Sequence, residues 1–188
     1  MARRRKSRQS APPAAPIPGR VDEDHQREQY FFDVPTVARL ADMVEAHARP
    51  VCLCVPMVAR ELARRGRSVQ LLDVDARFSQ LPGFTRWDLY RPTPLAETPD
   101  LILSDPPFTL VRLSQLFTAI HTLCRGELRT RVAIVWPTAR ALDITGTFAP
   151  FGLRETDFEP GYVSVRPIEE NRASLFANFE LDPRWGLE

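Results

Sequence analysis

Residues 101–108 read LILSDPPF, a stretch that joins an apolar run to a proline-rich loop. Leu101, Ile102 and Leu103 form a short, continuous run of apolar side chains, which is typical of a strand buried on both faces of a parallel sheet. Each of the two prolines that follow fixes its own φ, lacks an N–H and pushes the residue before it out of the helical region. The stretch therefore predicts a buried strand that ends in a stiff, extended loop.

On both sides of this strand, helix and strand patterns alternate along the chain. Apolar side chains at helical spacing, with proline at one start and glycine at two ends, predict helices at residues 35–47, 56–66, 110–123 and 137–148. Apolar runs predict further strands at residues 51–55, 69–74, 84–90, 132–136, 152–158 and 175–181. Such alternation predicts an α/β fold, a mostly parallel sheet with helices on both faces. The last two strands have no clear helix between them, which predicts a C-terminal antiparallel hairpin.

The residues that follow strands are the candidates for chemistry, because such a sheet binds its ligand outside the carboxyl ends of its strands. The Asp105 carboxylate and the Pro106 carbonyl are two acceptors on a rigid loop, and an amine has hydrogens to donate to both. Pro107 stiffens the loop, and Phe108 offers a flat face on which a base can stack. These four residues are the candidate catalytic group. The alternative is a rigid turn with a buried aromatic side chain.

Acidic residues also end the second and third predicted strands. The carboxylate of Asp73, or in second place that of Asp75, could accept both hydroxyls of a ribose, as the acid of dinucleotide-binding folds does. Asp88 could accept from an adenine amino group while Leu89 packs on the ring. The alternative for these acids is a solvated surface position.

No metal site or membrane segment is predicted. Cys52 and Cys54 are too close for an ordinary disulfide and wrongly spaced for a zinc knuckle, so they fit buried thiols in a reducing compartment. The histidines show no metal-ligand spacing, and no apolar run approaches the roughly 20 residues that a membrane helix requires. We expect a cytoplasmic protein, or a nuclear or nucleolar one in a eukaryote.

The first 28 residues are predicted to be a disordered, basic and proline-rich extension of a domain that spans residues 29–188. Residues 1–20 carry six basic side chains and no acid, so removing them changes the net charge from +1 to −5. Arg3, Arg4 and Arg5 would attract the phosphates of a nucleic acid. The alternative is a solvated terminus or a nuclear address.

Four segments, at residues 29–33, 52–56, 71–80 and 104–108, resemble one methyltransferase family in their order and spacing. The sequence DPPF at residues 105–108 resembles the (Asp/Asn/Ser)-Pro-Pro-(Tyr/Phe/Trp) motif of amino-nitrogen methyltransferases. The family includes the zinc-knuckle-containing ribosomal RNA adenine-N6 methyltransferase and the translation-elongation-factor lysine methyltransferase. The resemblance covers about residues 29–181.

The resemblance implies the seven-stranded, Rossmann-like sheet of S-adenosylmethionine-dependent methyltransferases, and that cofactor. Val55 and Pro56 stand where a glycine-rich turn usually admits a cofactor, and the family lacks that glycine signature as well. Residues 29–33 would lie over the cofactor and substrate entrance. Trp136 could line the target pocket or pack in the core, and Asn178 matches an asparagine near the family's last strand. The candidate substrate-binding residues are Gln29, Tyr30, Phe31, Phe32, Trp136, Asn178, Arg3, Arg4 and Arg5.

By this resemblance the chain is an N-methyltransferase, and we expect RNA as its partner and N6 of an adenine as its target, with ribosomal RNA favoured. The alternatives are a lysine of a translation factor and an inactive scaffold with the same fold. The ribosomal RNA enzyme has appended zinc modules that help to hold RNA, whereas this chain has neither their ligand spacing nor a basic body. It would therefore rely on its basic arm, need a partner protein or act on another substrate.

Overall fold

A seven-stranded sheet forms the centre of the structure, a computed structural model that describes residue 19 and residues 21–186. Its strands are β1 (Pro50–Leu53), β2 (Gln70–Asp73), β3 (Phe84–Arg86), β4 (Leu101–Ser104), β5 (Arg131–Pro137), β6 (Arg154–Glu155) and β7 (Ala173–Ala177). The order across the sheet is β3-β2-β1-β4-β5-β7-β6. Strands β1 to β5 are parallel to one another, and β7 is antiparallel to both β5 and β6. The predicted α/β sheet with its C-terminal antiparallel hairpin is confirmed.

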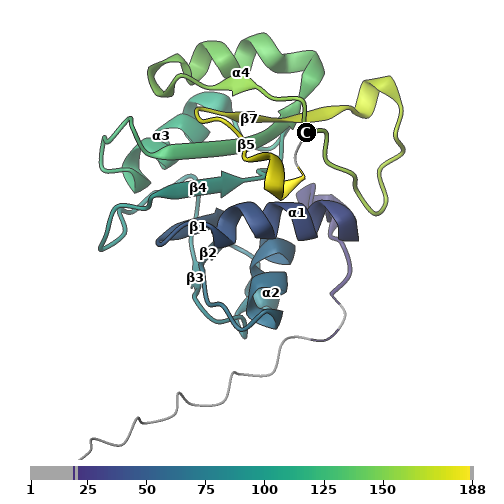
Figure 1. The fold of residues 1–188 in the computed structure, drawn as a ribbon, viewed down its shortest axis with the longest axis vertical. Coiled ribbons are helices and arrows are strands. Elements are labelled where there is room, and N and C mark those ends of the chain that lie inside the picture. Colours follow the sequence, from purple (N-terminus) through teal and green to yellow (C-terminus); the bar gives the residue numbers. More distant parts are fainter. Residues whose placement is uncertain (1–18, 20, 187–188) are drawn as a thin grey trace, which may run out of the picture.

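Two pairs of helices cover the two faces of this sheet (Figure 1). They are α1 (Val34–Glu45), α2 (Pro56–Arg64), α3 (Leu113–Leu123) and α4 (Ala141–Thr147). Strand residues alternate between the two faces: Cys52 packs in the cluster of α1 and α2, whereas Val51 and Leu53 pack in the cluster of α3 and α4. Short 3-10 turns complete the chain: η1 (His25–Arg27), η2 (Ala76–Phe78), η3 (Thr138–Arg140), η4 (Ala149–Phe151), η5 (Glu169–Asn171) and η6 (Pro183–Trp185). None of the helices in the described part of the chain is long and apolar enough to cross a membrane.

Local sequence sets where the helices begin and end. The Asp33 carboxylate accepts a hydrogen bond of 2.9 Å from the Thr36 amide and caps α1. Pro56 opens α2, and Gly66 takes a φ of +81° just beyond its end. The third helix starts at Leu113 rather than at the predicted residue 110, because the Val111 amide donates to the Pro107 carbonyl in a turn that precedes it.

The last strands differ from their predicted bounds, and this changes the role of Asn178. The strand β6 has two residues, and β7 ends at Ala177. Because β7 runs antiparallel to β5, the next residue lies beside the amino end of β5. There the Asn178 Oδ1 accepts from the Val132 amide (2.8 Å), and its Nδ2 donates to the Thr130 carbonyl (2.9 Å). The predicted role of Asn178 in substrate binding does not fit this position, since ligands of such sheets bind at the opposite, carboxyl edge.

Residues 21–33, here called the N-terminal segment, lie against the domain (purple in Figure 1). The predicted boundary lay after residue 28, but the Glu28 carboxylate already accepts from the Thr109 amide at 2.9 Å. Further along, the Val163 amide donates to the Phe31 carbonyl, and the Asp33 amide donates to the Gly161 carbonyl, each at 2.9 Å. The contacts of the domain therefore begin before residue 29. Arg3, Arg4 and Arg5 lie outside the described residues.

Replacing Asn178 with alanine should destabilise the fold. The change leaves the Val132 amide and the Thr130 carbonyl without their side-chain partner, and a buried unsatisfied polar group costs roughly 1–3 kcal/mol. We expect a loss of that size in the free energy of unfolding, measured with urea. The control is Asn171→Ala, which removes a hydrogen bond to the Arg166 carbonyl at the exposed surface and should change stability by less than about 0.5 kcal/mol. Equal stability of the two variants would contradict the structural role of Asn178.

Candidate functional site

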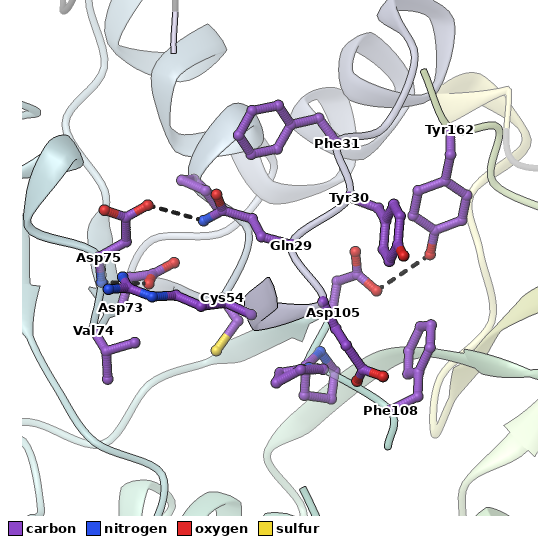
Figure 2. Close-up of a pocket in the computed structure, with 15 residues that line it drawn as sticks. Gln29, Tyr30, Phe31, Cys54, Asp73, Val74, Asp75, Asp105, Phe108 and Tyr162 are labelled. Carbon is purple, nitrogen blue, oxygen red and sulfur yellow. Dashed lines mark hydrogen bonds between the residues drawn. The ribbon is translucent and has the colours of Figure 1, made fainter. Parts of the chain in front are cut away.

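The candidate site lies where the strand order reverses, between β1 and β4. Leu53 of β1 pairs with Ser104 of β4, and the chain leaves these strands toward helices on opposite faces of the sheet. A crevice opens at such a switch point. A cavity of about 90 Å³ occupies it. The lining residues are Arg27, Glu28, Gln29, Tyr30, Phe31, Cys54, Pro56, Asp73, Val74, Asp75, Asp105, Pro106, Pro107, Phe108 and Tyr162 (Figure 2).

Cys54 makes the turn after β1 in place of a glycine. Its φ of +59° lies in the left-handed region, which costs a residue with a side chain roughly 1–2 kcal/mol. Its amide donates to the Leu72 carbonyl, which holds the turn against β2. Burial, with the charges of Asp73 and Asp105, raises the pKa of the thiol well above its usual range. The thiol therefore stays protonated at neutral pH and is not a nucleophile.

Asp73, at the end of β2, presents a buried carboxylate to the cavity. The side chain is 5% exposed, and its Oδ1 accepts from the Asp75 amide at 2.9 Å. Burial raises the pKa of Asp73 to about 6, against the effect of the hydrogen bonds from backbone amides. An ionised carboxylate has about four acceptor positions, so most of the capacity of Asp73 is left for a ligand.

Both carboxylate oxygens of Asp75 instead accept hydrogen bonds from protein groups. Arg77 donates to both of its carboxylate oxygens, from Nε at 3.0 and 2.9 Å and from Nη2 at 2.6 Å, and Gln29 Nε2 donates to Oδ2 at 3.1 Å. Burial alone raises the pKa of Asp75, but these hydrogen bonds outweigh it and the pKa is lowered. Arg77 also donates to Gln29 Oε1 (2.6 Å) and to the Asp22 carbonyl (2.9 Å). Asp75 thus anchors the N-terminal segment, and the arrangement favours Asp73 as the acceptor for a ligand.

The remaining residues predicted near a cofactor are placed differently. Pro56 lines the cavity, whereas Val55 is 3% exposed in the core at the start of α2. Leu89 is 7% exposed and packs in the core of the α3 and α4 face. Asp88 is exposed, and its Oδ1 accepts from the Tyr90 amide at 2.8 Å. The structure does not bring these three residues into the cavity, because Val55 and Leu89 pack in the core and Asp88 is exposed to solvent.

The loop after β4 forms the floor of the cavity. The Asp105 amide donates to the Leu53 carbonyl at 3.3 Å, which extends the pairing of β4 with β1. Desolvation raises the pKa of the Asp105 carboxyl well above its usual range, against a hydrogen bond from Tyr162. At the far end of the loop, the Phe108 carbonyl accepts from Arg140 Nη1 at 3.1 Å. Both ends of the loop are therefore held.

Trp136 supports this loop from behind. It is fully buried, and its ring meets the Phe108 ring edge to face at a centroid distance of 5.3 Å. The Arg140 guanidinium lies over the Trp136 ring, 4.8 Å from its centroid. Trp136 packs in the core of the α3 and α4 face. The structure thus agrees with the core-packing alternative for this residue, and not with a place in the wall of a pocket.

A second, outer groove of about 630 Å³ adjoins the inner cavity. Glu28, Tyr30, Phe108 and Tyr162 line both, so they form the passage between them. Arginines stand on the outer wall: Arg140, Arg166 and Arg172. The three aromatic residues of the N-terminal segment lie in different places relative to the cavity and the groove. Tyr30 is in the passage, Phe31 lines the inner cavity, and Phe32 is 5% exposed in the core.

Tyr162 is a site residue that the sequence did not single out. It belongs to the connection between β6 and β7, and its hydroxyl donates to Asp105 Oδ1 at 3.3 Å (Figure 2). The one sequence signal nearby is Gly161, where an added Cβ would lie 2.2 Å from the Asp33 Oδ2. A larger residue would displace the Asp33 carboxylate, which caps α1, so glycine is favoured there. Within residue 19 and residues 21–186, no group of three or more His, Cys, Asp or Glu side chains is placed to hold a metal ion.

Known proteins are similar to this chain in family and in fold. A family model described as "Probable N6-adenine methyltransferase" matches residues 23–181. No curated protein sequence matches the chain significantly. Magnesium protoporphyrin IX methyltransferase from Synechocystis PCC 6803, solved with bound S-adenosylmethionine, is 15% identical with a TM-score of 0.52, over 76% of each chain. A TehB-like S-adenosylmethionine-dependent methyltransferase from Corynebacterium glutamicum is 19% identical with a TM-score of 0.51, over 77% of this chain and 88% of its own. These two likenesses establish the fold.

Replacing Arg77 with alanine should loosen the N-terminal segment. Asp75 and Gln29 would lose their shared partner, and hydrogen bonds to charged groups contribute roughly 1.5–3 kcal/mol. This corresponds to roughly ten- to a hundred-fold faster amide exchange in residues 21–33, measured by hydrogen–deuterium exchange. The control is Arg184→Ala, which breaks an exposed ion pair with Asp182 and should leave that exchange unchanged. Equal protection in wild type and Arg77→Ala would show that the Arg77 network does not hold the segment.

Proposed function

This chain belongs to the family of probable N6-adenine methyltransferases, and from that premise we propose that it transfers a methyl group from S-adenosylmethionine to N6 of an adenine in RNA. Ribosomal RNA is the class of RNA that we favour. One observation carries the proposal. Asp105 lines the inner cavity together with Asp73, and it is hydrogen-bonded to Tyr162, which with Phe108 lines the passage to the outer groove.

Asp73 in the inner cavity supports the proposal that S-adenosylmethionine binds there. Asp73 is a buried carboxylate whose hydrogen bonds, within the described residues, come from backbone amides, and a ribose offers two hydroxyl donors to it. Ligand cavities usually exceed about 300 Å³, whereas this one measures about 90 Å³. Residues 27–31 of the N-terminal segment line this cavity, so we infer that the segment moves when the cofactor binds. When bound, the cofactor would supply a methyl group carried on a sulfonium.

Asp105 and Pro106 would orient the acceptor. The N6 amine of adenine is a weak nucleophile because its lone pair is delocalised into the ring. Hydrogen bonds from its two hydrogens to the Asp105 carboxylate and the Pro106 carbonyl would turn the lone pair toward the methyl group, while Phe108 stacks on the base. This is catalysis by positioning and electrostatics. After transfer, the methylated nitrogen would carry a positive charge and would release one proton to solvent.

The outer groove would hold the rest of the nucleotide chain. An adenine can reach Asp105 only if it is unpaired or turned out of its helix. The groove that leads to the passage has a volume of about 630 Å³ and is lined by Arg140, Arg166 and Arg172. Arginine suits phosphate groups because its fork of donors matches their oxygens. The basic side chains of residues 1–20 would add phosphate contacts of their own.

Replacing Asp73 with alanine should weaken the binding of S-adenosylmethionine by roughly ten- to a hundred-fold, because a charge-assisted pair of hydrogen bonds is lost. For the wild type, the ionised carboxylate accepts both hydroxyls. The affinity should therefore be full well above pH 6 and fall as the pH drops through the Asp73 pKa of about 6. Titration calorimetry measures both effects. Asp88→Ala, an exposed acid outside the cavity, should bind normally. Unchanged affinity in a folded Asp73→Ala variant would remove the ribose role.

Incubation of the protein with labelled S-adenosylmethionine and total RNA, then total protein, from the source cell tests the acceptor. We expect label in RNA, as N6-methyladenosine. Asp105→Ala should lower kcat by roughly a hundred- to a thousand-fold, and Asp105→Asn should be milder because its amide oxygen still accepts one hydrogen bond.

Phe108→Leu separates the two acceptors, since a base needs the flat ring whereas a lysine chain needs only an apolar wall. It should weaken RNA binding by about 1–3 kcal/mol. Label in protein alone, with Phe108→Leu active, would make the acceptor a lysine. Near-normal turnover in a folded Asp105→Ala variant would refute the mechanism.

A further inference from the structure

The backbone of Tyr162 is fixed by its pairing with the N-terminal segment. Phe32 and Tyr162 form an antiparallel bridge. The hydrogen bonds on either side join Val163 to Phe31 and Asp33 to Gly161, both at 2.9 Å. The Gly161 amide also donates to Thr36 Oγ1 at 2.9 Å. This part of the β6–β7 connection is therefore held against the start of α1 through several independent contacts.

The side chain of Tyr162 reaches from this anchor to the catalytic loop. Its ring packs on the Phe32 ring at a centroid distance of 5.0 Å, and its hydroxyl donates to Asp105 Oδ1 at 3.3 Å (Figure 2). The other two tyrosines of the chain are placed otherwise. Tyr30 stacks on His25, and the Tyr90 hydroxyl donates to the Leu110 carbonyl. Among the three phenols, Tyr162 is the one bonded to Asp105.

We propose that Tyr162 is a positioning residue for methyl transfer, whose hydroxyl holds one carboxylate oxygen of Asp105 and leaves the other free to accept from the target amine. A carboxylate without this bond can rotate about its χ angles, and both oxygens then compete for the amine hydrogens. With Oδ1 occupied by the phenol, Oδ2 and the Pro106 carbonyl form a fixed pair of acceptors. This inference rests on the proposed function and deepens it.

The same bond should set the pH range in which Asp105 works. A donor to the ionised carboxylate stabilises it, so loss of the phenol should raise a pKa that desolvation already raises. A protonated Asp105 would be a poorer acceptor for the amine. The other titratable groups around the cavity are on separate elements: Cys54 after β1, Asp73 at the end of β2, Asp75 just beyond it, and Arg27, Glu28 and Tyr30 in the N-terminal segment. None of these groups is hydrogen-bonded to the Tyr162 hydroxyl, which donates to Asp105.

The test is Tyr162→Phe, which keeps the ring and its contact with Phe32 and removes the hydroxyl. We expect unchanged affinity for S-adenosylmethionine, a kcat lower by roughly ten- to a hundred-fold, and an acidic limb of the kcat profile moved to higher pH. In the Asp105→Asn background, which has no carboxylate to titrate, adding Tyr162→Phe should change kcat much less than it does alone. Tyr90→Phe removes a tyrosine hydrogen bond outside the cavity and should leave both the pH profile and the activity unchanged.

A second measurement tests the Tyr162–Asp105 hydrogen bond without relying on enzyme activity. The carboxyl carbon of Asp105 is titrated by NMR in wild type and in Tyr162→Phe, and its pKa should be higher in the variant. Equal pKa values would overturn the inference whatever the activity. A higher pKa with unchanged kcat and pH profile would also overturn it, since the bond would then have no part in positioning. A higher pKa in a protein that methylates neither RNA nor protein would leave the Tyr162 bond standing and refute the proposed function instead.

Discussion

The pairing of β1 with β4 is the constraint on which the rest of the site depends. Leu53 pairs with Ser104, and the Asp105 amide continues the ladder to the Leu53 carbonyl. The chain then leaves for helices on opposite faces, which opens the crevice. Cys54 and Asp105 are the first residues beyond the Leu53–Ser104 pair, so they lie side by side at the floor of the crevice. The left-handed turn at Cys54 follows from this geometry and not from a glycine-rich sequence.

The three acids of the site differ in how many protein groups donate hydrogen bonds to them. Asp73 and Asp105 have few protein partners, and desolvation raises the pKa of both. Each keeps acceptor capacity for a ligand, which is the property that binding a ribose or an amine requires. Asp75 is as deeply buried as Asp73, but Arg77 and Gln29 occupy its oxygens and lower its pKa. The Asp75 carboxylate therefore holds the N-terminal segment in place, although Asp75 is only two residues from Asp73.

The N-terminal segment joins the two halves of the site. At the β2 side, Gln29 is bound to Asp75 and Arg77. At the other side, the same segment pairs with the strand of backbone that carries Tyr162. The same segment therefore contributes to the wall of the cavity and to the surroundings of Asp105. Phe31 and Phe32 of the segment also pack in the core beside the sheet, so apolar contacts hold the segment as well as hydrogen bonds.

The sequence by itself determined the α/β alternation, the buried strand before DPPF, and the places of Asp73, Asp105 and Phe108, because these depend on local patterns and on the rule that ligands bind beyond parallel strand ends. Only the tertiary structure decided three roles. Tyr162 meets Asp105 across 57 positions of sequence, Gln29 meets Asp75 across 46, and Asn178 meets Val132 across 46. No local pattern carries such information. Which oxygen of a carboxylate is free depends on side chains that only the completed fold brings within hydrogen-bonding distance.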